Sequence, residues 1–249
     1  GKKMFTQANE FGFLPENSGA ENKKALQAAM DMGGTIIVSL PGEYALSGTV
    51  YIGSDTTLIC ANGVYFKKVQ DEGGFVHVLL NKGALQKQYD WHIVIENLCI
   101  IVNDVDCLDS EVFGLRGQLA LFYVKDVKIT GFRCMDLGKR QFGIHICTFE
   151  DVLIDDVKIY GDKDGVHLGR GKRFTIQNGV FQTFDDAIAL NAHDYDTSNP
   201  ELGWIENGVV KNCHDLNAEN TTGYFCRILA GAWRDWTKGM QVQKSDTVV

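Results

Sequence analysis

Residues 151–159, with the sequence DVLIDDVKI, belong to a set of five similar short segments. The members are HIVIENLCI at 92–100, DVKITGFRC at 126–134, DVLIDDVKI at 151–159, RFTIQNGVF at 173–181 and GWIENGVVK at 203–211. Their aligned isoleucines, Ile95, Ile129, Ile154, Ile176 and Ile205, are 34, 25, 22 and 29 residues apart. One core length repeated with loops of varying size is typical of a solenoid.

A column of turn residues accompanies these isoleucines. Two residues after each Ile lie, in chain order, Asn97, Gly131, Asp156, Asn178 and Asn207. Asn, Asp and Gly tolerate left-handed backbone or form local turns, so the column marks a bend between two short strands. We therefore expect the five isoleucines to point inward and to form one stack.

A second register of 22 residues runs through FGIHI at 142–146, DGVHL at 164–168 and DAIAL at 186–190. Alternation with a period of two places three pairs inward, namely Ile144 and Ile146, Val166 and Leu168, and Ile188 and Leu190. Each strand is too short to be stable alone, so rungs stacked about 4.8 Å apart are needed to bury them. The two registers predict an all-β fold, a right-handed single-stranded parallel β-helix with about three strands per turn.

Residues 18–34, SGAENKKALQAAMDMGG, are expected to form an N-terminal capping helix. Ala25, Leu26, Ala29 and Met30 share one helical face, and the glycines at 33 and 34 end the helix. Such a helix would cover the open end of the solenoid, which otherwise exposes apolar core and strand edges. We expect residues 1–249 to form one β-helix domain, and the strand-like ending KSDTVV suggests part of a longer protein.

Composition and charge exclude several classes of protein. The chain is 45% hydrophobic and 22% charged, with only 3 Pro, which fits a large buried core and not a disordered protein. A net charge of −8 argues against nucleic acid as a partner, and the longest apolar runs are too short for a membrane span. The 7 cysteines show no CxxC pair, so we expect buried thiols without disulfides or bound metal.

The segment GGTIIVSLPGEYALSGTVYIGSDTTLICANG, residues 33–63, together with the preceding helix, resembles the start of the pectin-lyase-like superfamily of right-handed β-helices. The resemblance continues through the rungs to about residue 230. Within that superfamily, KDGVHL at 163–168 and FDDAIAL at 184–190 are similar to paired motifs of glycoside hydrolase family 28, the polygalacturonases. The family carries Asn-Thr-Asp-Gly and, about one rung later, Gly-Asp-Asp.

The motif match implies three catalytic carboxylates. Asp164 matches the Asp of the first motif, and Asp185 and Asp186 match the pair in the second. The motifs also differ from the family pattern. Asp162, Lys163 and Phe184 replace its Asn, Thr and Gly, and Tyr224 stands where a later Gly-His-Gly motif would place His.

The chemistry of glycoside cleavage gives these carboxylates roles. One carboxyl protonates the leaving oxygen and another activates water, with about 6.5–9.5 Å between them when the anomeric centre inverts. Asp164 and Asp186 are one rung apart, and Asp185 adds a third negative charge that raises at least one pKa. We expect Asp186 to be the acid because it lies nearest the apolar core, which requires a bend at residues 184–186. The alternatives are a polar turn stack and a calcium site.

An outward column next to the carboxylates is a candidate substrate-binding surface. If Ile144, Val166 and Ile188 point inward, then His145, His167 and Ala189 point outward. Aligning CRIL at 226–229 with IALN adds Arg227 to the same face. Arg227 could bind a uronate carboxylate through two hydrogen bonds, with Arg170 as a second candidate, while Ala189 leaves room for a sugar ring. In the other interpretation, the two histidines only cover exposed strand positions.

The insertion NAHDYDTSNPELGW, residues 191–204, enlarges one repeat and brings further polar and aromatic groups to this region. His193 and Tyr195 are candidate substrate-binding residues, and the ring of Trp204 suits stacking on a sugar face. Trp233 and Trp236 either line the same region or pack against the last rungs. The insertion could also be a solvated connector.

The resemblance implies an inverting glycoside hydrolase that acts on a uronate-containing, pectin-like polysaccharide. We expect a secreted or periplasmic monomer. No cofactor, membrane or nucleic-acid partner is expected. Two alternatives remain open. A lyase would use the carboxylates to hold Ca²⁺ and a basic residue to remove a proton, and an adhesin-like β-helix would bind carbohydrate without cleaving it.

Overall fold

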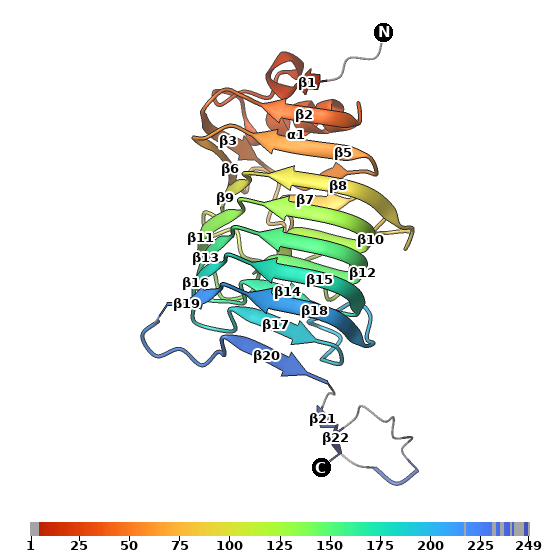
Figure 1. The fold of residues 1–249 in the computed structure, drawn as a ribbon. Coiled ribbons are helices and arrows are strands. Elements are labelled where there is room, and N and C mark those ends of the chain that lie inside the picture. Colours follow the sequence, from red (N-terminus) through yellow and green to blue (C-terminus); the bar gives the residue numbers. More distant parts are fainter. Residues whose placement is uncertain are drawn as a thin grey trace.

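The computed structural model describes residues 5–216 and 218–230, together with 233–234, 237–239, 241 and 247–248. The chain coils into a stack of parallel strands that run through three faces (Figure 1). The first face holds β4 (Val50–Ile52), β7 (Leu79–Asn81), the first halves of β10 (Gly117–Thr130) and β12 (Phe142–Asp155), β14 (Val166–Leu168), β17 (Ile188–Asn191) and β20 (Cys226–Leu229).

The second face is continuous with the first because β10 and β12 bend and take part in both. It holds β1 (Phe5–Gln7), β2 (Gly34–Val38), β5 (Thr56–Cys60), β8 (Asp90–Glu96), the second halves of β10 and β12, β15 (Gly171–Gln177) and β18 (Ile205–Lys211). The third face is a separate sheet of β3 (Gly42–Leu46), β6 (Val64–Lys68), β9 (Cys99–Ile101), β11 (Arg133–Leu137), β13 (Lys158–Gly161), β16 (Val180–Thr183) and β19 (His214–Asp215). Two short strands, β21 (Trp233–Arg234) and β22 (Thr247–Val248), pair with each other.

The predicted turn column is present, with one error. Asn97, Gly131, Asp156 and Asn178 all have positive φ, as expected for bends between rungs. The register continues from these residues to Asn212 and not to Asn207. Asn207 belongs to a different left-handed column, at the start of the second face, whose members are Asp55, His92, Asp126, Asp151, Arg173 and Asn207.

The predicted isoleucine stack is confirmed for four of its five members. Ile95, Ile129, Ile154 and Ile176 are consecutive partners in the second face, and each is fully buried. Val210, and not Ile205, pairs with Ile176, while Ile205 pairs with Gly171. The prediction for Ile205 was wrong because both left-handed columns accept Asn, so an alignment on Asn207 slipped by five residues.

The second predicted register is confirmed in full. Ile144, Val166 and Ile188 pair in sequence, and so do Ile146, Leu168 and Leu190. All are buried except Leu190, which packs half-buried against the same core.

Truncation of Ile176 to Ala should lower the free energy of unfolding by about 2–5 kcal/mol, because the stacked neighbours leave a cavity. Urea or thermal unfolding followed by circular dichroism measures the loss. Thr175→Ala is the control, since Thr175 is half-buried and outside the core cluster. A loss below about 0.5 kcal/mol for Ile176→Ala would contradict its core position.

The N-terminal segment contains a 3₁₀ helix, η1 (Ala8–Phe11), and the expected α-helix, α1 (Gly19–Met30). Ser18 and Glu21 form a capping box at the start of α1. Ala25, Leu26, Ala29 and Met30 are buried and join the core cluster of the first rungs, beside which α1 lies in Figure 1.

A buried lysine is the most unusual feature of the core region. Lys68, at the end of β6, has 0% relative exposure. Its Nζ lies 2.8 Å from Val76 O, 2.9 Å from Val105 O, 3.0 Å from Gln118 Oε1 and 2.8 Å from Gln141 Oε1. Burial lowers the pKa of Lys68 to about 7, although nearby thiols and carboxylates oppose this. The ammonium thus joins parts of the chain that are up to 73 residues apart.

Among the described residues, no helix is both long and apolar enough to cross a membrane. The seven cysteines are all free. Cys60, Cys134 and Cys147 are buried as expected, whereas the other four are half-buried.

Candidate active site

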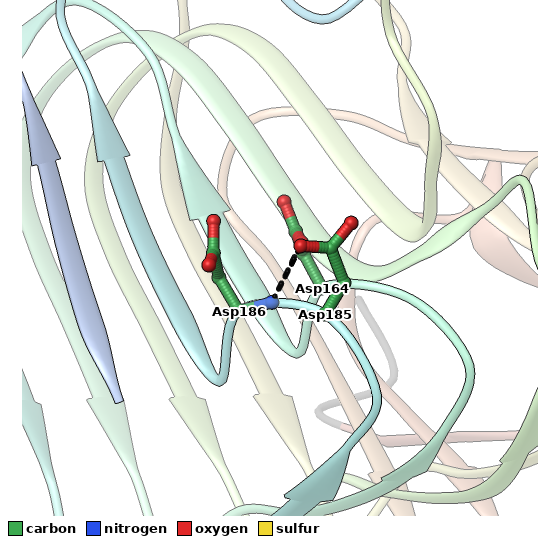
Figure 2. Close-up of side chains that lie close together, drawn as sticks. All are labelled: Asp164, Asp185 and Asp186. Carbon is green, nitrogen blue, oxygen red and sulfur yellow. Dashed lines mark hydrogen bonds between the residues drawn. The ribbon is translucent and has the colours of Figure 1, made fainter. Parts of the chain in front are cut away.

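Three carboxylates gather where two consecutive rungs enter the first face. Asp164 lies in the turn between β13 and β14, and Asp185 and Asp186 lie in the equivalent turn between β16 and β17. The predicted bend is present at residues 184–185, so neighbouring side chains reach the same region. Figure 2 shows the three side chains together, and one oxygen from each lies within 4.8 Å of the others.

Hydrogen bonds hold the two turns in register. The backbone N–H of Asp186 donates to Asp164 Oδ1 at 3.2 Å and to Asp185 Oδ1 at 3.0 Å. The backbone N–H of Tyr224 donates to Asp186 Oδ1 at 2.9 Å. Asp164 Oδ2 lies 2.9 Å from Nδ1 of His167. The carboxylates are therefore held by the backbone and by a buried ring.

Two glycines allow the turns to approach this closely. A Cβ on Gly165 would lie 2.6 Å from Ala187 O, and a Cβ on Gly223 would lie 2.0 Å from the carbonyl carbon of Asp185. Any larger residue at 223 would push away the segment whose Tyr224 N–H reaches Asp186.

The three carboxylates differ in their surroundings. Asp186 is 2% exposed and Asp164 is 5% exposed, whereas the side chain of Asp185 is 28% exposed. Burial and the negative charge of Asp164 raise the pKa of Asp186 to about 6, and the Tyr224 N–H only partly opposes the rise. Because Tyr224 occupies Oδ1, Oδ2 is the atom of Asp186 that can carry the proton.

Each carboxylate offers one oxygen within 4.8 Å of an oxygen of the other two. This is a nearest-atom distance, which is shorter than the separation of the carboxyl groups themselves, for which an inverting mechanism expects about 6.5–9.5 Å. A water at about 2.8 Å from three oxygens fits a triangle with sides of 4.8 Å. Three carboxylate oxygens are also the kind of ligands that Ca²⁺ prefers.

Two basic residues near the carboxylates were missed by the sequence analysis. Lys163 Nζ lies 2.8 Å from Asp185 Oδ2. Arg116 is half-buried, and the negative charges of Asp164 and Asp185 are among those that oppose the lowering of its pKa by burial. Lys163 could have been found from its position beside Asp164. No local pattern points to Arg116, since it lies 48 residues before Asp164.

The predicted register of the outward column is confirmed, but its exposure is not. His145, His167, Ala189 and Arg227 are consecutive partners across four strands. His145 and Ala189 have 0% relative exposure and His167 has 1%, so these three are not at the surface and cannot contact a polysaccharide there. The prediction of two histidine substrate contacts was wrong for this structure.

Two loops cover the histidines. His145 Nδ1 accepts a bond from the Arg116 N–H at 2.9 Å, and His145 Nε2 lies 2.8 Å from Asn199 Oδ1. Asn199 belongs to the insertion 191–204, which folds back over the first face. The side-chain amide of Asn199 donates a hydrogen bond to Asn191 O. Burial lowers the pKa of His145 well below its usual value, so the ring is neutral. The His167 ring stacks on Phe142 with 4.3 Å between centroids.

Arg227 remains beside the carboxylates. Its Nη1 lies 3.9 Å from Asp186 Oδ2, and its side chain is 40% exposed. Tyr224, whose backbone N–H reaches Asp186, is 64% exposed. The Arg227 side chain, with half-exposed Asp185 and Lys163, forms the accessible part of the site.

The other predicted contacts lie elsewhere. Arg170 follows β14 whereas Asp164 precedes it, so the two residues are at opposite ends of that strand. The His193 and Trp204 rings pack edge to face with 5.3 Å between their centroids, and His193 Nδ1 is hydrogen-bonded to Ala230 O. Tyr195 is 60% exposed on the insertion. Trp236 and the side chain of Trp233 lie outside the described residues.

Comparison with known proteins gives a fold and no family. No family model matches the chain, and no curated protein matches it in sequence. A family 28 exopolygalacturonase of Yersinia enterocolitica is similar in structure, with a TM-score of 0.66, 14% identity and coverage of 85% of this chain and 49% of that one. A candidate glycosyl hydrolase of Parabacteroides merdae gives a TM-score of 0.63, 14% identity and coverage of 85% and 97%. The surface adhesin PfbA of Streptococcus pneumoniae gives a TM-score of 0.61 and 16% identity, with coverage of 92% of this chain and 65% of that one.

The chain is therefore a parallel β-helix, a fold that it shares with these three proteins. At these identities the likeness establishes the fold alone, because this fold carries both enzymes and adhesins.

Proposed function

We propose that the chain is an inverting glycoside hydrolase that cleaves a uronate-containing, pectin-like polysaccharide, as in the polygalacturonases. The observation that carries this proposal is the cluster of three carboxylates, in which burial and the negative charge of Asp164 raise the pKa of Asp186 to about 6. General acid and base catalysis requires a carboxyl that is partly protonated near neutrality and a second carboxyl group close to it.

Each residue of the site has a proposed role. Asp186 donates its Oδ2 proton to the leaving glycosidic oxygen. Asp164 and Asp185 bind and deprotonate the attacking water, which fits between their oxygens. Arg227 pairs with the carboxylate of a bound uronate, and the exposed Tyr224 ring stacks on a sugar face.

The test is a screen of plant and host polysaccharides, polygalacturonate first, for new reducing ends. We expect reducing ends without an unsaturated product, and no loss of activity with a chelator. Release of the opposite anomer, followed by NMR, would support inversion. Retention at the anomeric carbon would contradict the inverting assignment.

The two alternatives give different results in the same assay. A Ca²⁺-dependent lyase would produce an unsaturated, ultraviolet-absorbing sugar and would stop when a chelator removes the ion. A carbohydrate-binding β-helix would slow a polysaccharide in an affinity gel and release no reducing ends. Either result would overturn the hydrolase proposal.

The pH profile of kcat/KM follows from the raised pKa of Asp186. The acid acts only when protonated, so activity should fall above pH 6, by roughly tenfold per pH unit, as that carboxyl ionises. Initial rates of reducing-end release between pH 4 and 9 measure this fall in activity. Activity that continues to rise through pH 8 would exclude Asp186 as the acid.

We also propose that the coil is right-handed and forms a single domain, with α1 covering its N-terminal end. Parallel crossovers are right-handed in about 98% of cases, and the buried face of α1 joins the core of the first rungs. Action on an extracellular polysaccharide implies a secreted or periplasmic protein, which we expect to be monomeric.

A further inference from the structure

We propose that a surface groove between Tyr89, Arg170 and Trp204, separate from the three carboxylates, binds one uronate unit of the polysaccharide. The assignment of the sugar class rests on the proposed function, whereas the groove and its groups do not. The site would hold a polymer on the protein surface while another part of the same polymer occupies the active site.

The groove has a volume of about 320 Å³, at the lower end of the range of small-molecule sites. Its floor is the outward row of the second face, where Glu150, Lys172 and Glu206 are lateral partners on adjacent strands. Tyr89 and Trp204 lie on its lining, although they are 115 residues apart in the chain. The first comes from the loop before β8 and the second from the insertion before β18.

Both aromatic rings are exposed and yet held in place. Tyr89 is 36% exposed, and its ring lies 5.0 Å from the ring of Tyr123 and 4.3 Å from Lys125 Nζ. Trp204 is 53% exposed, and its ring packs against the His193 ring with 5.3 Å between the centroids. Rings held beforehand lose little conformational freedom on binding, and their faces suit the apolar CH groups of a sugar.

Arg170 is the cation of the groove that is free to bind a ligand. Its stem packs on Gly203, where a Cβ would lie 3.3 Å from Arg170 Cβ, and its guanidinium forms no ion pair with any described residue. The charge of Arg170 lowers the pKa of Glu201, but the Glu201 oxygens are already bonded to Thr148 Oγ1 and Tyr123 OH. Lys172, by contrast, is paired with Glu150 at 3.5 Å.

A uronate fits this set of groups better than a neutral sugar. A planar guanidinium can bind a carboxylate through two parallel hydrogen bonds, which a hydroxyl cannot match. Glu206 is exposed on the floor and can accept bonds from sugar hydroxyls. The combination predicts an anionic sugar ring held between two aromatic side chains, with its carboxylate on Arg170.

The experiment measures binding of trigalacturonate to the full chain carrying Asp186→Asn, which is expected to slow turnover by roughly 10²–10⁴-fold, by isothermal titration calorimetry. Arg170→Gln and Trp204→Ala in this background should each weaken one binding event by roughly tenfold or more. The matched controls are Arg133→Gln and Trp91→Ala. Arg133 is an arginine of the third face whose side chain is 33% exposed and paired with Asp156, and Trp91 is 51% exposed outside the groove. Neither control should change binding, and maltotriose, the neutral probe, should bind at least tenfold more weakly.

The outcomes separate this inference from the proposed function. Binding that depends on Arg170 and Trp204 supports the groove even if the unmodified chain releases no reducing ends, which would defeat only the hydrolase proposal. A second outcome is that the unmodified chain hydrolyses polygalacturonate while neither substitution changes the binding of trigalacturonate. This outcome would overturn the groove proposal and leave the hydrolase proposal standing. Equal binding of maltotriose, or no binding of trigalacturonate, would also overturn the uronate site. Circular dichroism of each variant establishes that a loss of binding is not a loss of fold.

Discussion

Asp186→Asn is expected to lower the turnover of polygalacturonate by roughly 10²–10⁴-fold, because it removes the titrating proton while keeping the shape of the side chain. The amide oxygen can still accept the bond from the Tyr224 N–H, so the turn should be preserved. The measurement is kcat at the pH optimum. Asp109→Asn is the control, since it makes the same chemical change at an exposed carboxylate outside the cluster. Full activity of Asp186→Asn would remove this residue as the acid.

The same substitution should not weaken the fold, and above pH 6 it should strengthen it. The pKa of Asp186 is about 6 in the folded chain against 3.8 for the free side chain, so ionisation of this carboxyl costs the folded state up to about 3 kcal/mol above pH 6. The cost disappears below pH 3.8, where both states are protonated. Thermal unfolding at pH 8 and at pH 3.5 should therefore show stabilisation of Asp186→Asn only at pH 8. A large loss of stability at both values would mean that Asp186 is a structural turn residue.

Lys68→Met is expected to lower the free energy of unfolding by about 3–5 kcal/mol. The substitution leaves two buried carbonyl oxygens and two buried glutamine oxygens without the ammonium that they contact. Methionine fills a similar volume, so the loss reports the polar contacts and not a cavity. Urea unfolding followed by circular dichroism measures it.

Lys67→Met is the matched control for Lys68→Met. Lys67 is the preceding residue of β6, its side chain is 36% exposed, and it makes only a 3.9 Å contact with Glu43. An effect below about 1 kcal/mol is expected there. Equal losses for the two variants would mean that the buried ammonium contributes no specific stabilisation.

The rungs could be predicted from the sequence because they depend on short-range periodicity. Inward residues recur every second position, and Asn, Asp or Gly marks the left-handed bends. Ile129, Ile154 and Ile176 could therefore be placed in one stack before the structure was known. The same rule failed at Ile205, where two turn columns with the same residue preference lie five positions apart and local pattern cannot separate them.

The carboxylate cluster was also predictable, for a related reason. A 22-residue repeat places Asp164 and Asp186 at equivalent positions, and equivalent positions in a parallel stack are lateral neighbours. Their register follows from that of Val166 and Ile188, which is confirmed. The role of the carboxylates in catalysis remains a prediction.

The environment of the predicted binding residues depends on contacts that no local pattern contains. Period-two alternation correctly placed His145 and His167 opposite the solenoid core, but whether that side meets solvent depends on loops from distant parts of the chain. Asn199 reaches His145 across 54 residues. Lys68 falls on the inward side of β6 with Val64 and Phe66, and Gln141, 73 residues away, supplies one of the oxygens around its ammonium. Repetition along the chain thus determines the strands, their inward faces and the alignment of the carboxylates, because each rung meets only its neighbours. The packing of the long loops onto the first face determines which outward side chains are buried and which stay free, because those contacts join residues far apart in the sequence.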